Sequence, residues 1–439
     1  MRLFMHALGV FVLAVAAGVL VSGCTPSPAG NGPQQGEVVK SDKARELSPT
    51  VDAADLAALV AGNSAFALDL YGAIRDEDGN LFYSPFSISI ALAMTYAGAG
   101  TRTEQQMAEA LHFTLSQAKL HPAFNALDLA LAGRGADAAG ADGEGFRLNV
   151  ANAIWGQKDY SFVSDYLDVL ALHYGAGLRV LDFMSDPESA RLVINGWVNE
   201  ETEGKITDLI SQGMLTTATR LVLTNAVYFN AAWAYPFEEE VTQDGTFHRL
   251  DGTEQTVPMM SQTEDFRYAE GPTYQAVELP YDGYELSMVI VLPAAGSFDD
   301  FEDSFDAAQV DTIVNSLASR RVALTMPTFT YESEFLLGQT LSGMGMSDAF
   351  SGYADFSGIA GVPGDLMIGE VVHKTFIRVD EAGTEAAAAT AVIMELTAMP
   401  DEQEIVEVTV DRPFVFLIRD IETRAILFIG RVLVVNPPE

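Results

Sequence analysis

Residues 381–392 read Glu-Ala-Gly-Thr-Glu-Ala-Ala-Ala-Ala-Thr-Ala-Val, a run of small side chains that follows the acidic residue Asp380. Alanine has a high helix propensity, so this window taken alone favours a surface helix or a flexible linker. The segments that follow, residues 408–416 and 425–435, are rich in Val, Ile and Phe and are typical of strands. A small-residue segment beside buried strands can instead slide between two strands and become one of them.

One face of such an inserted strand is free of charge. Counting alternate residues from Thr384, Glu385 and Glu395 fall on the opposite face, where water could reach them. The inward set is Thr384, Ala386, Ala388, Thr390, Val392 and Met394. An inward charge would cost several kcal/mol, so this pattern indicates a segment suited to insertion. Gly383 is expected to supply backbone freedom where the chain turns.

Blocks dispersed along most of the chain decide between these alternatives. The C-terminal block reads Asp411-Arg-Pro-Phe-Val-Phe-Leu-Ile-Arg-Asp420 and is followed by Ala425-Ile-Leu-Phe-Ile-Gly-Arg431. Together with earlier blocks, in the same order along the chain, it resembles the serpin family. These earlier blocks are residues 80–92, 98–103, 148–155, 194–206, 221–233 and 371–376.

The resemblance implies one large domain over residues 51–439 with a mixed α/β (α+β) serpin fold. It implies three β-sheets, eight or nine helices and an exposed reactive loop at about residues 380–411, in a monomer. Local patterns agree with a mixed fold: residues 219–230 are nearly all apolar and predict a strand buried on both faces. Residues 185–207 predict a helix with Ser185 as its N-cap.

Composition limits the partners. The chain has 439 residues, of which 49% are hydrophobic, and a net charge of -37 from 61 acidic and 24 basic residues. Like charge repels, so nucleic acid and anionic membrane surfaces are excluded as partners. The acidity itself is interpreted as a solubility adaptation, with electrostatic steering of a basic partner as the alternative.

The N-terminus predicts export. Residues 1–23 have a short basic start and an apolar run, which is typical of a signal peptide. Val21-Ser-Gly-Cys24 resembles the lipobox of prokaryotic lipoproteins, with lipid carried on Cys24, the only cysteine of the chain. An uncleaved transmembrane anchor is the alternative. Residues 24–50 have linker composition and predict a disordered tether. The protein is therefore expected at the cell surface or in the periplasm, or in the extracellular space, attached to a membrane only through its N-terminal lipid.

No enzyme motif stands out. The chain contains no Gly-x-Ser-x-Gly, His-Glu-x-x-His, phosphate-loop or dinucleotide-binding pattern, so we expect no catalytic residues, no metal and no cofactor. Four histidines are interpreted as solvated: His112, His121, His173 and His248. A Ser-His pair that includes His373, in a surface hydrolase, remains as an alternative.

The resemblance assigns four groups of site residues. The polar "shutter" in the middle of the main sheet would comprise Ser84, Ser87, Asn225 and His373. The "breach", where insertion starts, would hold Trp233. The hinge would comprise Glu381, Gly383, Thr384, Glu385, Ala386, Ala387, Ala388, Ala389 and Thr390. The usual spacing from Glu381 places the reactive bond at Thr397-Ala398, with Leu396, Met394 and Met399 as neighbouring candidates.

The implied function is that of a suicide-substrate inhibitor of serine proteases. An elastase-like or subtilisin-like protease would cut the loop after a small residue and be held as a covalent complex when the loop inserts. The alternative is a non-inhibitory serpin that acts as a binding or chaperone module. From residue 397 to residue 413 the loop is several residues longer than in many serpins, so the scissile bond stays open.

Overall fold

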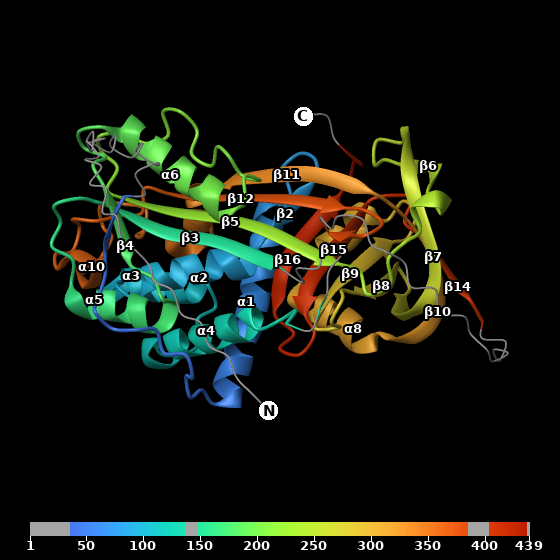
Figure 1. The fold of residues 1–439 in the computed structure, drawn as a ribbon, viewed down its shortest axis with the longest axis horizontal. Coiled ribbons are helices and arrows are strands. Elements are labelled where there is room, and N and C mark those ends of the chain that lie inside the picture. The colour runs from blue at the N-terminus through green and yellow to red at the C-terminus, as the bar shows by residue number, and fades with distance from the viewer. Residues whose placement is uncertain (1–35, 137, 139–146, 385–403, 437–439) are drawn as a thin grey trace, which may run out of the picture. The chain divides into compact units, whose positions relative to one another are not determined.

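Two β-sheets, covered by helices on their faces, make up the described part of the chain in a computed structural model (Figure 1). The structure describes residues 36–136, 138, 147–384 and 404–436. The two sheets contain different parts of the chain. The first includes the predicted hinge segment, and the second includes most of the C-terminal strands.

The first sheet has seven strands in the order β1-β4-β3-β5-β13-β12-β11. In this order the strands are β1 Glu37–Val39, β4 Leu178–Leu181, β3 Arg147–Gln157, β5 Leu221–Ala232, β13 Gly383–Thr384, β12 Glu370–Val379 and β11 Phe329–Leu336. Every residue of β5 is buried, as its continuous apolar run predicts, because β5 lies inside the sheet and both of its faces are covered.

The second sheet runs β14-β10-β7-β8-β9-β15-β16-β2, and β6 pairs with β7 beside this path. Its strands are β14 Val406–Thr409, β10 Ala318–Pro327, β7 Glu254–Gly271, β8 Tyr274–Pro280, β9 Leu286–Pro293, β15 Phe414–Asp420, β16 Ile426–Val432, β2 Leu81–Tyr83 and β6 Gln243–His248. The 18-residue β7 pairs with β6 and β10 and also with β8. It thereby joins two of the three predicted sheets into one hydrogen-bonded path.

The helices complete the predicted mixed architecture. They are α1 Ala53–Ile74, α2 Pro85–Tyr96, α3 Thr101–Ala110, α4 Gln117–Ala132, α5 Ser164–Val169, α6 Pro187–Glu201, α7 Phe298–Asp303, α8 Ala307–Ser316, α9 Gly338–Leu341 and α10 Ser357–Ala360, with single-turn segments η1 Leu170–Tyr174, η2 Glu239–Val241 and η3 Ser342–Met346. Several of these helices span only one turn, so the described residues show more helical segments than the eight or nine expected.

Helices α2 and α6 cover opposite faces of the first sheet (Figure 1). On one face Leu223 and Val227 of β5 join the main core with α2, and on the other Val222 and Ala226 join a smaller core with Trp197 of α6. This alternation follows from the two-residue period of a strand. Helix α1 is long and apolar enough to cross a membrane, but 56% of its most apolar window is buried in the fold, as in a core helix.

The N-cap of α6 differs from the prediction. Ser185 does not cap the helix: its N–H donates to Asp182 Oδ1 (3.1 Å), which holds it outside the first turn. Asp186 is the N-cap instead, since its Oδ1 accepts from the N–H of Ser189 at 3.0 Å. Aspartate caps as well as serine does, and Pro187 at the first helical position suits the start of a helix.

The folded body begins earlier than composition predicts. Residues 36–50 had the composition of a tether, yet β1 pairs antiparallel with β4 at the edge of the first sheet. Beyond β1, Arg45 bonds Asn125 Oδ1 (2.8 Å) and Asp128 Oδ2 (2.5 Å) of α4. Backbone pairing and ion pairs therefore hold this segment in the compact unit, although it lacks a hydrophobic pattern.

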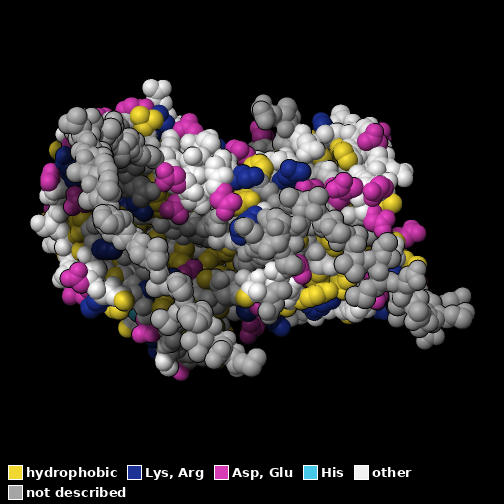
Figure 2. All heavy atoms as spheres, viewed as in Figure 1, with side chains coloured by type: hydrophobic (Ala, Val, Ile, Leu, Met, Phe, Trp, Pro, Cys, Tyr) yellow, Lys and Arg dark blue, Asp and Glu magenta, His cyan; other side chains and the backbone are white. Residues whose placement is uncertain are grey.

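Acidic side chains dominate the charged surface. Figure 2 shows Asp and Glu along the upper edge and right-hand side of the face in view, with Lys and Arg interspersed. Many of the basic side chains are engaged in ion pairs, for example Lys374 with Glu332 at 3.1 Å. The exposed surface is therefore mainly acidic, in line with the excess of 61 acidic over 24 basic residues.

Candidate functional site: the hinge and the polar row beneath it

The chain enters the first sheet immediately after β12. It turns at residues 380–382, and β13 then runs antiparallel between the ends of β5 and β12. Gly383 pairs with Ala232, and Thr384 pairs with Ala231 on one side and Val379 on the other. Below this point β5 and β12 pair directly with each other in parallel. The hinge therefore occupies only the top of a path that is otherwise closed.

Gly383 is required by close packing. A Cβ at this position would lie 2.2 Å from the carbonyl oxygen of Ala231 and 2.7 Å from the Cα of Ala232. The φ of Gly383 is not in the left-handed region that favours glycine. The expectation that Gly383 supplies backbone freedom for a turn is therefore wrong, and glycine is needed here for lack of space. The backbone of β5 leaves no room for a side chain here.

Asp380 closes the turn that precedes β13. Its Oδ1 accepts from the N–H groups of Ala382 (3.1 Å) and Gly383 (3.3 Å), and its Oδ2 pairs with Arg378 Nε at 3.1 Å. Burial raises the pKa of Asp380, and the positive charge of Arg378 opposes that shift. Glu381 is held as well, because its Oε1 accepts from Thr242 Oγ1 at 2.6 Å.

Trp233 and Tyr281 form the floor under this turn. Their rings stack with centroids 4.7 Å apart and an interplanar angle of 7°. Trp233 donates its Nε1–H to the carbonyl of Asp380 (3.0 Å) and its N–H to the carbonyl of Ala382 (2.9 Å). Tyr281 shares a hydrogen bond of 2.8 Å between its hydroxyl and Thr384 Oγ1, and burial raises the pKa of this phenol. Sequence reasoning missed Tyr281, since only the pairing of β13 brings it to Thr384.

A row of polar side chains crosses the middle of the same sheet. Asn152 of β3, Asn225 of β5 and His373 of β12 are register partners on three neighbouring strands. His373 is completely buried, its Nε2 accepts from the N–H of Ser84 at 3.0 Å, and its Nδ1 lies against Asn225 Oδ1. Since Nε2 accepts, the proton resides on Nδ1 and is donated to Asn225. Burial lowers the pKa of His373 to about 3, which keeps the ring neutral.

Ser87 completes the row from the start of α2. Its Oγ accepts from Asn225 Nδ2 at 2.6 Å and bonds Asn152 Oδ1 at 3.1 Å, while Asn152 Nδ2 donates to the carbonyl of Ser87 at 3.2 Å. The structure thus brings together Ser84, Ser87, Asn225 and His373, and it adds Asn152, which sequence reasoning missed. The signal for Asn152 was its position in Asn149-Val-Ala-Asn152, a polar residue in an apolar strand.

No hydroxyl nucleophile faces His373 among the described residues. Ser84 contacts the ring through its backbone N–H, and its Oγ accepts from the N–H of Ser87 (3.2 Å) as the N-cap of α2. The whole arrangement is buried, with both Ser84 and Ser87 at most 2% exposed. A buried neutral histidine that accepts from a backbone N–H gives no support to the hydrolase alternative.

Comparisons with known proteins agree with this geometry. The sequence matches the family described as Serpin (serine protease inhibitor) over residues 61–437. The chain belongs to the serpin family. It is 40% identical over 376 residues to an uncharacterized serpin-like protein of Thermococcus kodakarensis, covering 86% of this chain and 85% of that protein. It is 39% identical over 389 residues to the leukocyte elastase inhibitor of Bos taurus, covering 85% and 98%.

A solved serpin shares the fold. The native structure of the thermophilic serpin tengpin superposes with a TM-score of 0.78 at 29% sequence identity, over 90% of this chain and 98% of tengpin. The expected mixed α/β serpin fold is therefore confirmed. In the present chain the residue predicted for the breach, Trp233, meets the predicted hinge residues Glu381, Gly383 and Thr384 at one end of β5. The residues predicted for the shutter meet at the middle of β5.

The remaining predicted site residues lie outside the described part of the chain. These are Glu385, Ala386, Ala387, Ala388, Ala389 and Thr390 of the hinge, the reactive-bond residues Thr397 and Ala398 with Met394, Leu396 and Met399, and the lipidation residue Cys24. Among the described residues, no group of three or more His, Cys, Asp or Glu side chains is arranged to hold a metal ion.

The prediction that His121 is solvated is wrong. His121 is 3% exposed, whereas it was expected to be solvated. Its Nδ1 lies 2.7 Å from the Tyr174 hydroxyl, and its ring stacks on His173 at 6.3 Å. Burial lowers the pKa of His121 to about 3. The surface interpretation failed because α4 turns this residue toward η1, a tertiary contact that the local sequence does not encode.

Proposed function

We propose that this serpin inhibits serine proteases by the suicide-substrate mechanism, in which the cleaved reactive loop inserts into the first sheet and traps the acyl-enzyme. The observation that carries the proposal is the position of β13 between β5 and β12, with those two strands paired directly below it. The hinge has already entered the path that a complete inserted strand would follow.

The register of β13 specifies where the rest of the loop would go. Thr384 pairs with Ala231 and Val379, so each further residue would lie one position lower on both strands. In that continued register Thr390 would lie level with Asn225 and His373, which are themselves partners in the closed sheet. A small hydroxyl side chain would then reach the polar row at the point where strand separation breaks the bond between His373 and Asn225.

The energetics favour insertion of this particular sequence. Separating β5 from β12 breaks one parallel ladder, and a new central strand forms two, each hydrogen bond contributing about 1 kcal/mol net. Ala386 and Ala388 would be the inward residues above Thr390, and their small size limits how far the two strands must part. An inward charge would cost several kcal/mol and slow a step that must outrun deacylation.

The target class follows from the loop and from the relatives. The reactive bond at Thr397-Ala398 has a small residue before the cut, which suits elastase-like or subtilisin-like proteases, and Leu396 would shift specificity toward chymotrypsin-like ones. Similarity to the leukocyte elastase inhibitor of Bos taurus supports the first class. The serpin would act as a monomer, with the protease as its covalent partner and neither a cofactor nor catalysis of its own.

The location belongs to the same proposal. Residues 1–23 direct export, and Cys24 carries lipid that attaches the protein to a membrane. Thirteen residue steps separate Cys24 from the start of β1 at Glu37, a reach of about 45 Å when fully extended. The inhibitor would therefore work close to the membrane surface, on proteases outside the cytoplasm.

The decisive experiment incubates the purified protein with a panel of serine proteases. A complex that survives SDS, together with a large rise in melting temperature after the loop is nicked, is the expected result. Mass spectrometry of the released peptide locates the reactive bond. A loop that is cleaved without complex or stabilisation would contradict the proposal and favour the non-inhibitory binding or chaperone module.

A further inference from the structure

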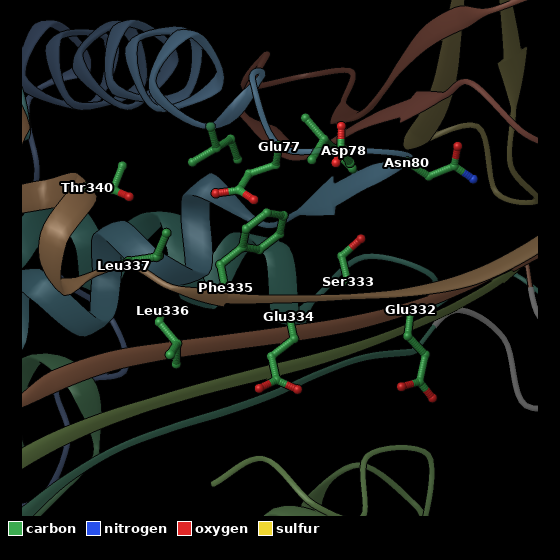
Figure 3. Close-up of a pocket in the computed structure, with 12 residues that line it drawn as sticks. Glu77, Asp78, Asn80, Glu332, Ser333, Glu334, Phe335, Leu336, Leu337 and Thr340 are labelled. Carbon is green, nitrogen blue, oxygen red and sulfur yellow. The ribbon is translucent and has the colours of Figure 1, made fainter. Parts of the chain in front are cut away.

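The edge of the first sheet opposite β1 borders a hollow. Within the described residues β11 is the last strand of the sheet and pairs only with β12. A hollow of about 390 Å³ lies between residues 332–337, at the end of β11 and one residue beyond it, and the turn at residues 77–80 that leads from α1 to β2. Figure 3 shows Ser333 and Phe335 pointing into this hollow, and Glu332, Glu334 and Leu336 pointing to the other side of the strand.

The backbone of β11 is oriented for further pairing here. The N–H of Thr330 points away from β12, because it donates to Asn436 Oδ1 at 2.7 Å. Backbone groups alternate in direction along a strand, so the N–H groups of Glu332 and Glu334 point to the same open side. Such an edge is a template for an added extended peptide.

The charges around the hollow specify what kind of peptide would fit. Glu332 and Glu334 lie on the strand, and Glu77 and Asp78 lie on the opposite wall (Figure 3). Lys374 offsets part of this charge, at 3.1 Å from Glu332 and 3.8 Å from Glu334. Glu332 and Glu334 with Lys374 leave one net negative charge on the outer side of the strand. Glu77 and Asp78 add two more on the side of the hollow, so both sides of this edge attract basic side chains.

The reactive loop of a second copy is the wrong occupant. Residues 385–404 contain five acidic residues and no Lys or Arg. Like charges on directly opposed strands destabilise pairing, so the acidic edge repels this loop. A partner with the opposite charge is required.

We propose that this edge, defined by Glu332, Glu334, Glu77 and Asp78 and here named the β11 groove, binds an extended basic peptide segment of another protein by β-strand addition. Lysine or arginine side chains lie beside Glu332 and Glu334, and the residues between them are small or apolar and face Ser333 and Phe335. This alternation follows from the side-chain directions on β11.

The test uses the purified full chain and fluorescein-labelled heptapeptides, with binding measured by anisotropy. The probe alternates lysine with valine, and three controls are a peptide of the same composition with its lysines in one block, one with glutamate in place of lysine, and one N-methylated at alternate residues. The alternating peptide is expected to bind at least about tenfold tighter than each control. Binding is also expected to weaken as salt rises from about 50 to 200 mM.

Charge-reversed variants locate the site. Glu332→Lys with Glu334→Lys, or separately Glu77→Lys with Asp78→Lys, is expected to weaken binding about tenfold. The matched control is Glu239→Lys with Glu240→Lys, which makes the same change in net charge on η2 outside the groove and is expected to change binding less than about twofold. Using two independent pairs keeps the test valid if one pair impairs folding.

Three results would overturn the proposal. Equal affinity for the alternating and block peptides would mean that binding depends on total peptide charge and not on strand pairing. Unchanged binding in both groove variants would place the site elsewhere. No binding of any peptide would mean that the acidic side chains serve only to protect an open sheet edge from pairing.

Discussion

Tyr281 and Thr384 share a buried hydrogen bond of 2.8 Å, and it joins the turn after β8 to the hinge segment β13. Both residues are at most 1% exposed. Because the Tyr281 ring also stacks on Trp233, one side chain supports the hinge from below and anchors it by its hydroxyl. In the proposed mechanism the same bond would have to be kept, or replaced, as the remainder of the loop follows Thr384 into the sheet.

Replacing Tyr281 with Phe should loosen the hinge while leaving the aromatic stack intact. Loss of this hydrogen bond is expected to cost about 1 kcal/mol and to speed hydrogen exchange at Gly383 and Thr384. The matched control is Tyr331→Phe, which removes another buried hydroxyl that donates to the carbonyl of Leu81 at 3.0 Å. That variant should lose similar stability without any change in exchange at the hinge.

Gly383→Ala is expected to expel β13 from the sheet. The new Cβ would lie 2.2 Å from the carbonyl oxygen of Ala231, and this atom belongs to a buried strand that cannot move aside. Limited proteolysis near the hinge should become faster. The control is Gly72→Ala on α1, where a Cβ meets nothing within 4 Å and stability should rise by about 0.5–1 kcal/mol. Unchanged hinge protection in Gly383→Ala would contradict the packing argument.

Stability should fall on acidification because of buried histidine. The pKa of His373 is about 3 in the folded protein and about 6.5 in the unfolded chain. Between these values only the unfolded state binds the proton, so His373 lowers stability by about 1.4 kcal/mol for each pH unit below 6.5. The free energy of unfolding, measured with denaturant between pH 6.5 and 4, should fall less steeply in His373→Gln than in the unmodified protein. The difference should be about 1.4 kcal/mol per pH unit.

A second variant separates the effect of His373 protonation from the effect of losing its hydrogen-bond partner. Asn225→Ala removes the partner of His373 and should lower stability at every pH, because it leaves a buried donor unsatisfied. The slope against pH should stay as in the unmodified protein, since His373 remains. His121→Gln should reduce the slope by the same amount as His373→Gln, because its pKa is also about 3.

A charge or a proline at an inward position of the hinge should convert the protein from an inhibitor into a plain substrate of the protease. In Thr384→Arg a guanidinium would occupy a completely buried position, and in Ala388→Pro an N–H needed by the new strand would be lost. Both variants should be cleaved without forming an SDS-stable complex. Glu385→Arg, on the opposite face, is the control and should still form one. A stable complex with Thr384→Arg would refute the insertion mechanism.

The hydroxyl of Thr390 should matter only after cleavage. If the register of Thr384 continues, Thr390 reaches Asn225 and His373 in the inserted state. Thr390→Val keeps the shape and removes the hydroxyl, so the nicked form should lose about 1 kcal/mol while the intact form stays unchanged. Equal loss in both forms, measured by denaturant unfolding, would place Thr390 elsewhere.

The local sequence predicts many of the elements of this fold. Residues 219–230 are apolar enough to predict a strand buried on both faces, and β5 is buried throughout. A turn signal at Asp282-Gly283 and the strand-breaking pair Ser84-Pro85 are also local features of the sequence, because turn and cap chemistry depend on near neighbours. The strand at residues 37–39 escaped prediction, since an edge strand of three residues depends on the partner β4 for its existence.

By itself, then, the sequence determined the local structures, the family, and an uncharged face on the segment after Gly383, because side-chain size, charge and period are properties of neighbouring residues. Only the tertiary structure decided that Tyr281 meets Thr384, that Asn152 joins Asn225 and His373, and that Gly383 has no room for a Cβ. These are contacts between residues distant in the chain, and strand register, which depends on the whole core, specifies which of them form.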